Sequence, residues 1–138
     1  MVCVYCGSST KVINSRHQQR SNAVWRRRQC LVCNAIFTSR EHIDLTESLR
    51  VQQAQDGKQL TPFRRDRLFL DIYESCKHRP TALGDAIALT QTIIDKLCLE
   101  AKGGLLTRLQ IVTEALAVLK RFDLAAATAY GAYHPPRK

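Results

Sequence analysis

The fold of the first third of the chain is decided by two short stretches, Cys3-Val4-Tyr5-Cys6 and Cys30-Leu31-Val32-Cys33. Each is a C-x-x-C pair, and 23 residues lie between them. Two such pairs supply four thiolates, which complete the tetrahedral shell of Zn²⁺ and leave no open position for catalysis. Gly7 and Asn34 follow the pairs, and both residue types tolerate the positive φ of a tight knuckle. The spacing therefore predicts one structural zinc ion per chain, with these ligands: Cys3, Cys6, Cys30 and Cys33.

The segment around the cysteines is expected to be rich in β-structure. Strands are predicted at residues 12–16, 23–28 and 35–39, separated by polar or cysteine-containing turns. Forty residues bury too little apolar surface to fold unaided, so the segment needs a further source of stability. The bound metal would supply it by cross-linking the two cysteine pairs. The alternative is that the four thiols are buried or redox cysteines. The two remaining cysteines, Cys76 and Cys98, lie on apolar helical faces and are expected to be core residues.

Positive charge is concentrated in the same segment. Residues 1–40 contain seven Lys or Arg and no Asp or Glu, out of a net charge of +9 for the chain. Such asymmetry indicates a polyanionic partner, although a solvated basic surface has the same composition. In a strand Arg26 and Arg28 share one face and Arg27 points to the other, and arginine binds phosphates and guanine edges. Trp25 is expected in the core, with base stacking as the alternative. The candidate nucleic-acid contacts are Lys11, Arg16, Arg26, Arg27, Arg28 and Arg40.

After a linker at 41–50 the pattern becomes helical. A β-hairpin is expected where 49–52 and 58–60 flank Asp56-Gly57, a turn signal. Helices are predicted from Pro62 towards Pro80, from Thr81 to about residue 101, after the capping box Thr107-x-x-Gln110, and over 124–133. The second helix is expected to bury these residues: Ile87, Thr90, Ile94, Leu97, Cys98 and Ala101.

Several function classes are not expected. No stretch approaches the roughly 18 apolar residues that span a membrane, and the N-terminus lacks the regions of a secretion signal. We therefore expect a cytoplasmic protein with no membrane partner, in which paired cysteines are explained by metal rather than by disulfides. We also expect no enzyme, since the metal shell is closed and no Ser-His-Asp or paired-carboxylate arrangement stands out.

The basic and cysteine motifs together resemble one known family. The run from Cys3 to Gly7, then Thr10 to Arg16 and Arg26 to Asn34, is similar to the N-terminal part of the NrdR family, bacterial repressors of ribonucleotide reductase genes. Downstream, the chain looks like the ATP-cone domain of that family at Pro62-Phe63, Asp66-Arg67-Leu68, Lys77-His78-Arg79-Pro80 and Phe122-Asp123. The resemblance covers nearly the whole chain and is closest up to residue 40.

The resemblance implies an α+β fold in two domains. Residues 1–45 would be a β-rich zinc ribbon that binds double-stranded operator DNA. Residues 46–138 would be a mainly helical ATP-cone with a small β-hairpin, which senses nucleotides and forms homo-oligomers. In the family, ATP and dATP favour different oligomers and the dATP-loaded forms bind DNA. The implied nucleotide-binding residues are Arg50, Val51, Phe63, Arg67 and Lys77.

The chain also departs from the family pattern. Val4 stands where the family has Pro, and Asn14 stands where it has Asp. The ATP-cone usually opens with a basic pair just before Asp-Gly, whereas residues 51–55 here contain no Lys or Arg. Arg50, Arg64 or Arg65 could replace the missing charges. One alternative function is therefore a zinc-ribbon adaptor whose cone domain oligomerises without sensing nucleotide, and another is an RNA-binding zinc ribbon.

Overall fold

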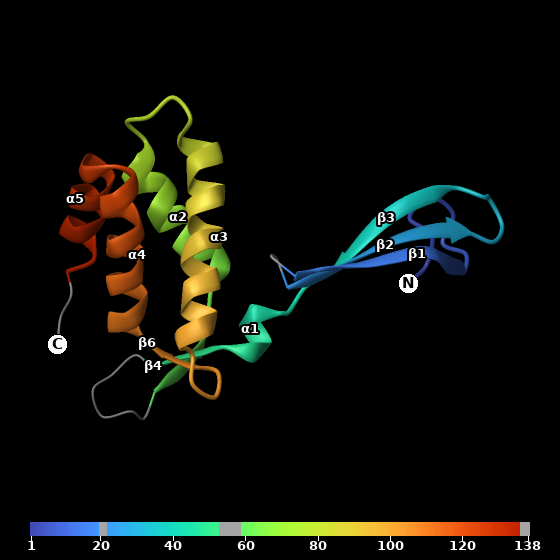
Figure 1. Cartoon of the computed structure of the whole chain (residues 1–138), viewed down its shortest axis with the longest axis horizontal. Coiled ribbons are helices and arrows are strands. Elements are labelled where there is room, and N and C mark those ends of the chain that lie inside the picture. The colour runs from blue at the N-terminus through green and yellow to red at the C-terminus, as the bar shows by residue number, and fades with distance from the viewer. Residues whose placement is uncertain (20–21, 53–58, 136–138) are drawn as a thin grey trace. The chain divides into compact units, whose positions relative to one another are not determined.

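The computed structural model describes residues 1–19, 22–52 and 59–135, and the chain divides into two compact units (Figure 1). We call Met1–Asp44 the ribbon and Leu45–Lys138 the helical unit. The predicted fold class is confirmed, because antiparallel strands are followed by a mainly helical region with a small sheet. None of the helices in the described parts of the chain has the length and apolarity to cross a membrane.

The ribbon is a three-stranded antiparallel sheet in the order β1-β2-β3. Its strands are β1 (Thr10–Gln18), β2 (Ala23–Cys30) and β3 (Ile36–Glu41), each at least as long as predicted. A bulge between Val12 and Asn14 shifts the register of β1 against β2. The sheet has little core of its own: among the described residues up to Asp44, the buried apolar side chains are Cys3, Ala23 and Cys30.

The helical unit combines four long helices with a small mixed sheet at one end of them (Figure 1). After the short α1 (Leu45–Ser48), the sheet runs in the order β5-β4-β6, with β4 antiparallel to β5 and parallel to β6. Its strands are β4 (Arg50–Gln52), β5 (Leu60–Pro62) and β6 (Leu105–Thr107). The pairing of β4 with β5 is that of the expected hairpin, while its turn at Asp56-Gly57 lies outside the described residues. Neither β6 nor α1 was predicted.

The four long helices enclose one hydrophobic core. They are α2 (Arg65–Cys76), α3 (Ala82–Glu100), α4 (Arg108–Phe122) and α5 (Leu124–Tyr133). Helix α2 packs against α3 and α5, and α4 packs against α3, α5 and β6. Fully buried side chains from three of the helices and from β6 meet in the centre, among them Ile72, Ile93, Leu97, Leu106 and Leu119.

The predicted buried face of α3 was partly wrong. Ile87 is 52% exposed and Cys98 is also exposed, whereas Ala86, Leu89 and Ile93 are buried. Thr90, Ile94 and Leu97 are buried as predicted, so the buried stripe is turned from the expected one by less than one residue, or about 70°. Helix α3 carries apolar residues around most of its circumference, so its sequence alone defines the inner face poorly.

A glycine pair starts β6. Gly103 and Gly104 both have positive φ, at +61° and +75°, which L-residues adopt at a cost. A Cβ on Gly104 would also lie 2.6 Å from the backbone oxygen of Ser48. The helix break expected here is confirmed, and the pair turns the chain directly from α3 into the sheet. The capping box at Thr107 and Gln110 then begins α4, as predicted.

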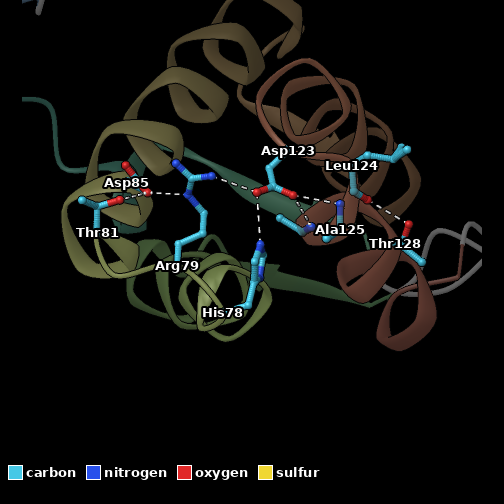
Figure 2. A network of polar contacts seen from close by, with 9 residues as sticks. His78, Arg79, Thr81, Asp85, Asp123, Leu124, Ala125 and Thr128 are labelled. Carbon is cyan, nitrogen blue, oxygen red and sulfur yellow. Dashed lines mark hydrogen bonds and ion pairs between the residues drawn. The ribbon is translucent and has the colours of Figure 1, made fainter.

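A polar cluster joins the α2–α3 turn to the α4–α5 junction (Figure 2). The Arg79 guanidinium donates to Asp85 at 2.8 Å and to Asp123 at 2.9 Å, and His78 Nε2 lies 3.1 Å from the same Asp123 oxygen. The other Asp123 oxygen accepts the N–H groups of residues 125 and 126 and so caps α5. Hydrogen bonds from the Ala126 N–H, His78 and Arg79 hold the pKa of Asp123 well below its usual range.

Candidate metal centre, basic face and ligand cavity

The four cysteines of the ribbon converge on one point. Their Sγ atoms all lie within 4.8 Å of one another. Cys6 Sγ is 3.5 Å from the sulfurs of Cys30 and Cys33, and Cys3 Sγ is 3.7 Å from that of Cys33. Tetrahedral zinc with Zn–S bonds of about 2.3 Å needs sulfurs about 3.8 Å apart. The donor set and its spacing therefore fit a structural zinc ion with a closed shell of thiolates.

The knuckle backbone prepares the thiols for metal binding. Gly7 has φ +72° and Asn34 has φ +57°, which confirms the positive φ expected after each pair. Backbone N–H groups of Val32 and Cys33 each lie 3.4 Å from Cys30 Sγ. Hydrogen bonds from Cys33 and Val32 lower the pKa of Cys30, and hydrogen bonds from the side chain and backbone of Ser8 lower the pKa of Cys6 to about 6. Both effects favour the thiolate, which is the form that binds zinc, at Cys6 and Cys30, whereas the side chains of Cys6 and Cys30 raise the pKa of Cys33.

One face of the ribbon sheet carries positive charges that form no ion pair with a residue that the structure describes. Side chains of directly paired residues on neighbouring strands lie on the same face. Trp25 pairs with Arg16 on β1 and with Arg40 on β3, and Arg27 follows Trp25 on the same face of β2. Lys11 belongs to this face as well, opposite Gln29. All four basic side chains are exposed, and we call them the basic face: Lys11, Arg16, Arg27 and Arg40.

Trp25 lies in the middle of the basic face. It is half-buried rather than a full core residue, because the described ribbon has no second layer to cover it. The Arg16 guanidinium lies 6.0 Å from its ring centroid, within the range of a cation–π contact. An aromatic ring among four exposed cations presents both charge and a stacking surface to a ligand.

Arg26 and Arg28 lie on the opposite face and are engaged within the ribbon. The Arg28 side chain is 9% exposed, and its Nε donates to Ser39 Oγ at 2.9 Å. Arg26 forms an ion pair with Glu41 at 3.0 Å. The strand pairing confirms the predicted alternation of Arg26, Arg27 and Arg28 between the two faces. The sequence did not reveal that Arg26 and Arg28 contact β3. The expected contact of Arg26 and Arg28 with nucleic acid stays a prediction. Both side chains are less exposed than those of the basic face.

The helical unit contains a cavity of about 840 Å³. It is lined by β4, by the segment from Thr61 into the first two turns of α2, by the start of α4 and by the end of α5. Three of the residues implied by the family resemblance meet there: Val51, Phe63 and Arg67. The volume is within the range of about 300–1,000 Å³ that is typical of small-molecule sites.

Two other implied residues lie elsewhere. Arg50 donates from Nη1 to the backbone oxygen of Thr46 and is not among the described residues that line the cavity. Lys77 is absent from that lining too, and it forms an ion pair with Glu74. Ten residues of α2 separate it from Arg67, which places it about 15 Å further along the axis.

The cavity also gathers charged and aromatic residues, most of which the sequence did not identify. Arg108 adds positive charge to that of Arg67, and Tyr130, Tyr133 and His134 contribute from α5 and its C-cap. Arg64, which the sequence named as a possible replacement for the missing charges, lines the cavity too and forms an ion pair with Asp66 at 2.8 Å. Neither Arg67 nor Arg108 forms an ion pair with a residue that the structure describes. Tyr130 is 2% exposed, and burial together with the nearby Asp71 raises its pKa far above the ordinary value, so its hydroxyl stays protonated. The capping box formed by Thr107 and Gln110 around Arg108 was the one local signal for that residue.

Comparison with known proteins connects these features. The family model described as "Transcriptional repressor NrdR-like, N-terminal domain" matches residues 1–41. A "Transcriptional repressor NrdR" of Syntrophus aciditrophicus is 32% identical over 124 residues, which cover 89% of this chain and 76% of the relative.

Two further relatives with the same description match shorter regions. The protein of Symbiobacterium thermophilum is 35% identical over 83 residues, or 60% of this chain and 53% of its own length. That of Staphylococcus aureus is 36% identical over 81 residues, or 58% and 50%. The metal centre, the basic face and the match over most of the chain lead to one conclusion: this protein belongs to the NrdR family of transcriptional repressors.

Proposed function

We propose that this protein is a zinc-dependent repressor of ribonucleotide reductase genes, which binds duplex operator DNA through the ribbon and is regulated by adenine nucleotides bound in the helical unit. Nucleotide binding would change the homo-oligomeric state and, with it, the affinity for DNA. The zinc ion is structural in this proposal, and no step of catalysis is assigned. Family membership supports the repressor function, and the basic face is the observation that supports DNA as its target.

The basic face suits DNA because its four cations form no ion pair with a described residue, whereas Arg26 and Arg28 on the opposite face contact β3. Four exposed cations surround Trp25, and the acidic Glu41 is paired on the other face. Arginine and lysine bind phosphates, and a guanidinium can also read guanine in the major groove. Each phosphate that is neutralised contributes about 0.9 to the slope of log affinity against log salt.

Binding of a duplex that carries the operator of a ribonucleotide reductase gene, followed by fluorescence anisotropy at several salt concentrations, tests the proposal. Replacing Arg16 and Arg27 together with Ala should lower the salt slope by about two units. The matched control is the pair Arg26 and Arg28, also replaced with Ala, which should change the slope less because both side chains already contact β3. An RNA competitor of the same sequence separates DNA from RNA binding. Equal slopes for the Arg16/Arg27 variant and the parent protein would contradict the assignment.

The cavity suits a nucleoside polyphosphate. Arg67 and Arg108, which form no ion pair with a described residue, provide positive charge in its lining, while Phe63 and Ile111 provide an apolar wall. Charge-assisted hydrogen bonds between guanidinium and phosphate are each worth about 1.5–3 kcal/mol. Arg67 and Arg108 would thereby compensate for the basic pair that residues 51–55 lack.

Calorimetric titration of the full chain with ATP and with dATP tests this part. Replacing Arg67 or Arg108 with Ala should weaken binding at least tenfold. Lys77→Ala is the matched control, since Lys77 is the C-cap of the helix that carries Arg67 but does not line the cavity. If Lys77→Ala abolishes binding and Arg67→Ala does not, the phosphate site lies elsewhere. Absence of heat with both nucleotides would favour the adaptor function, which the lack of Lys and Arg in residues 51–55 also favours.

A further inference from the structure

Asn14 is an uncharged residue that lies among the cations of the basic face. It stands between Lys11 and Arg16 on β1 and pairs directly with Arg27 on β2. Its side chain is exposed, and its amide makes no hydrogen bond to a residue that the structure describes. A polyanion that the cations attract is therefore brought directly against this amide.

A bulge in β1 places Asn14 and Lys11 on the same face of the sheet. In a regular strand, residues three positions apart point to opposite faces. The register of β1 against β2 shifts between Val12 and Asn14, so one extra residue is inserted there. Before the bulge Lys11 pairs with Gln29, and after it Asn14 pairs with Arg27. Gln29 and Arg27 share one face of β2, so the bulge adds Lys11 to the face that carries Asn14.

The Asn14 amide has a different chemistry from that of its charged neighbours. It lacks the charge that makes lysine and arginine strong phosphate ligands, and it carries two N–H donors beside one oxygen acceptor. In the major groove, adenine presents an acceptor at N7 next to a donor at N6, and an asparagine amide binds both at once. Two other amides on this face are placed less well for a ligand: Gln29 is half-buried, and Gln18 is the last residue of β1 and pairs with Ala23 rather than with a cation.

We propose that Asn14 is the residue with which the basic face reads adenine in the major groove of its DNA target, while the surrounding cations bind the phosphates. Cβ atoms of directly paired residues are about 4.5–5.5 Å apart, and successive base pairs are about 3.4 Å apart. Asn14 and Arg27 therefore reach the same or neighbouring base pairs. This inference rests on the proposed DNA binding and names a base that the face recognises.

The identity of the residue matters for the base that is read. Asn14 is one of the positions at which this chain departs from the family pattern, which has Asp. A carboxylate offers acceptors alone, so it matches the N4 donor of cytosine and cannot bind adenine N7. Exchanging the two residue types should therefore exchange the preferred base.

Competition binding with a set of duplexes tests the inference. The duplexes carry the operator of a ribonucleotide reductase gene with each base pair replaced in turn, and binding to the zinc-loaded full chain is followed by fluorescence anisotropy. For the parent protein, replacing one A·T pair should weaken binding by roughly 5- to 150-fold. In Asn14→Ala the ratio at that pair should fall to about one while the other positions keep theirs. In Asn14→Asp a C·G pair should become the preferred one there.

An atomic probe and a matched variant sharpen the test. Placing 7-deazaadenine at the same pair removes the N7 acceptor, which should weaken binding of the parent protein and leave that of Asn14→Ala unchanged. Gln18→Ala is the matched control: it removes an amide from the same face and should keep the base preferences of the parent protein. Retention of one zinc ion per chain, measured by elemental analysis, shows that the ribbon of each variant is folded.

The pattern over positions, rather than the affinity for one duplex, decides the outcome. If Asn14→Ala weakens binding to all duplexes equally, Asn14 contacts only the DNA backbone and the inference is overturned. It is also overturned if Gln18→Ala, and not Asn14→Ala, removes the preference for adenine. If the parent protein binds the operator no better than an unrelated duplex, the proposed repressor function fails first and the inference fails with it.

Discussion

Removing zinc should unfold the ribbon and leave the helical unit folded. Among the described residues of the ribbon, the buried apolar side chains are two cysteines and one alanine, whereas the hydrophobic core begins at Leu49. Structural zinc sites are worth on the order of 10–16 kcal/mol at neutral pH, comparable to or larger than the roughly 5–15 kcal/mol that stabilises a typical domain. Without the metal, the ribbon has no other source of stability of that size, so Cys30→Ser should abolish its fold.

The chain offers a separate reporter for each unit. Trp25 is the single tryptophan and lies on β2 of the ribbon, so its fluorescence follows the ribbon alone. The circular dichroism at 222 nm comes mainly from α2, α3, α4 and α5, all in the helical unit. Chelation of zinc, or Cys30→Ser, should shift the Trp25 emission to the red while the 222 nm signal and its thermal transition persist. Cys98→Ser is the control, because Cys98 is exposed on α3 and outside the metal centre.

Two results would refute this reasoning. A protein shown by elemental analysis to be zinc-free, yet with native Trp25 emission and a protease-resistant ribbon, would mean that the strands hold together without metal. Loss of the helical signal together with that of Trp25 would mean that the two units do not fold independently.

Two further predictions concern the helical unit. Gly104→Ala should destabilise it by at least about 1–2 kcal/mol in urea denaturation, because the residue needs positive φ and its Cβ would meet the Ser48 carbonyl; Gly84→Ala, on α3 with open space at the Cβ, should be neutral or stabilising. Asp123→Asn should keep the α5 cap but remove acid sensitivity. Since the pKa of Asp123 is lowered by folding, its stabilising effect is present above the ordinary pKa of about 3.9 and is lost as the pH falls below it. The urea midpoint should therefore drop more steeply below pH 4 in the parent protein than in the variant, and parallel curves would argue against this role.

Features that depend on local chemistry were predictable from the sequence. The two C-x-x-C pairs, the positive φ of Gly7 and Asn34 and the capping box at Thr107 each involve residues within a few positions of one another. The alternation of a strand likewise placed Arg27 opposite its two neighbours. Such features follow from backbone geometry and ligand spacing, and they need no knowledge of the tertiary fold.

Features that depend on distant pairing were not predictable. The parallel ladder of β4 with β6 joins Arg50 to Leu105, and no local pattern indicates it. That ladder brings the start of α4, and thus Arg108, to the cavity. The position of Lys77 is a different case: ten positions along a helix correspond to about 15 Å and nearly three turns, so Lys77 lies outside the described lining of the cavity, and its part in nucleotide binding stays a prediction.

The register of the ribbon also changes how its charge should be counted. The first 40 residues carry seven cations, but Arg26 and Arg28 are bound to Glu41 and Ser39 within the sheet. The basic face holds four of the cations, so the described part of one ribbon accounts for a salt slope of at most about four units. A repressor that engages two ribbons on a two-fold symmetric operator should then show at most about eight. Arg26 and Arg28 contribute in a different way, because their contacts connect β2 to β3. Arg27 is thus exposed on the basic face, whereas Arg26 and Arg28 stabilise the sheet. The number of charges in the sequence does not distinguish these two roles.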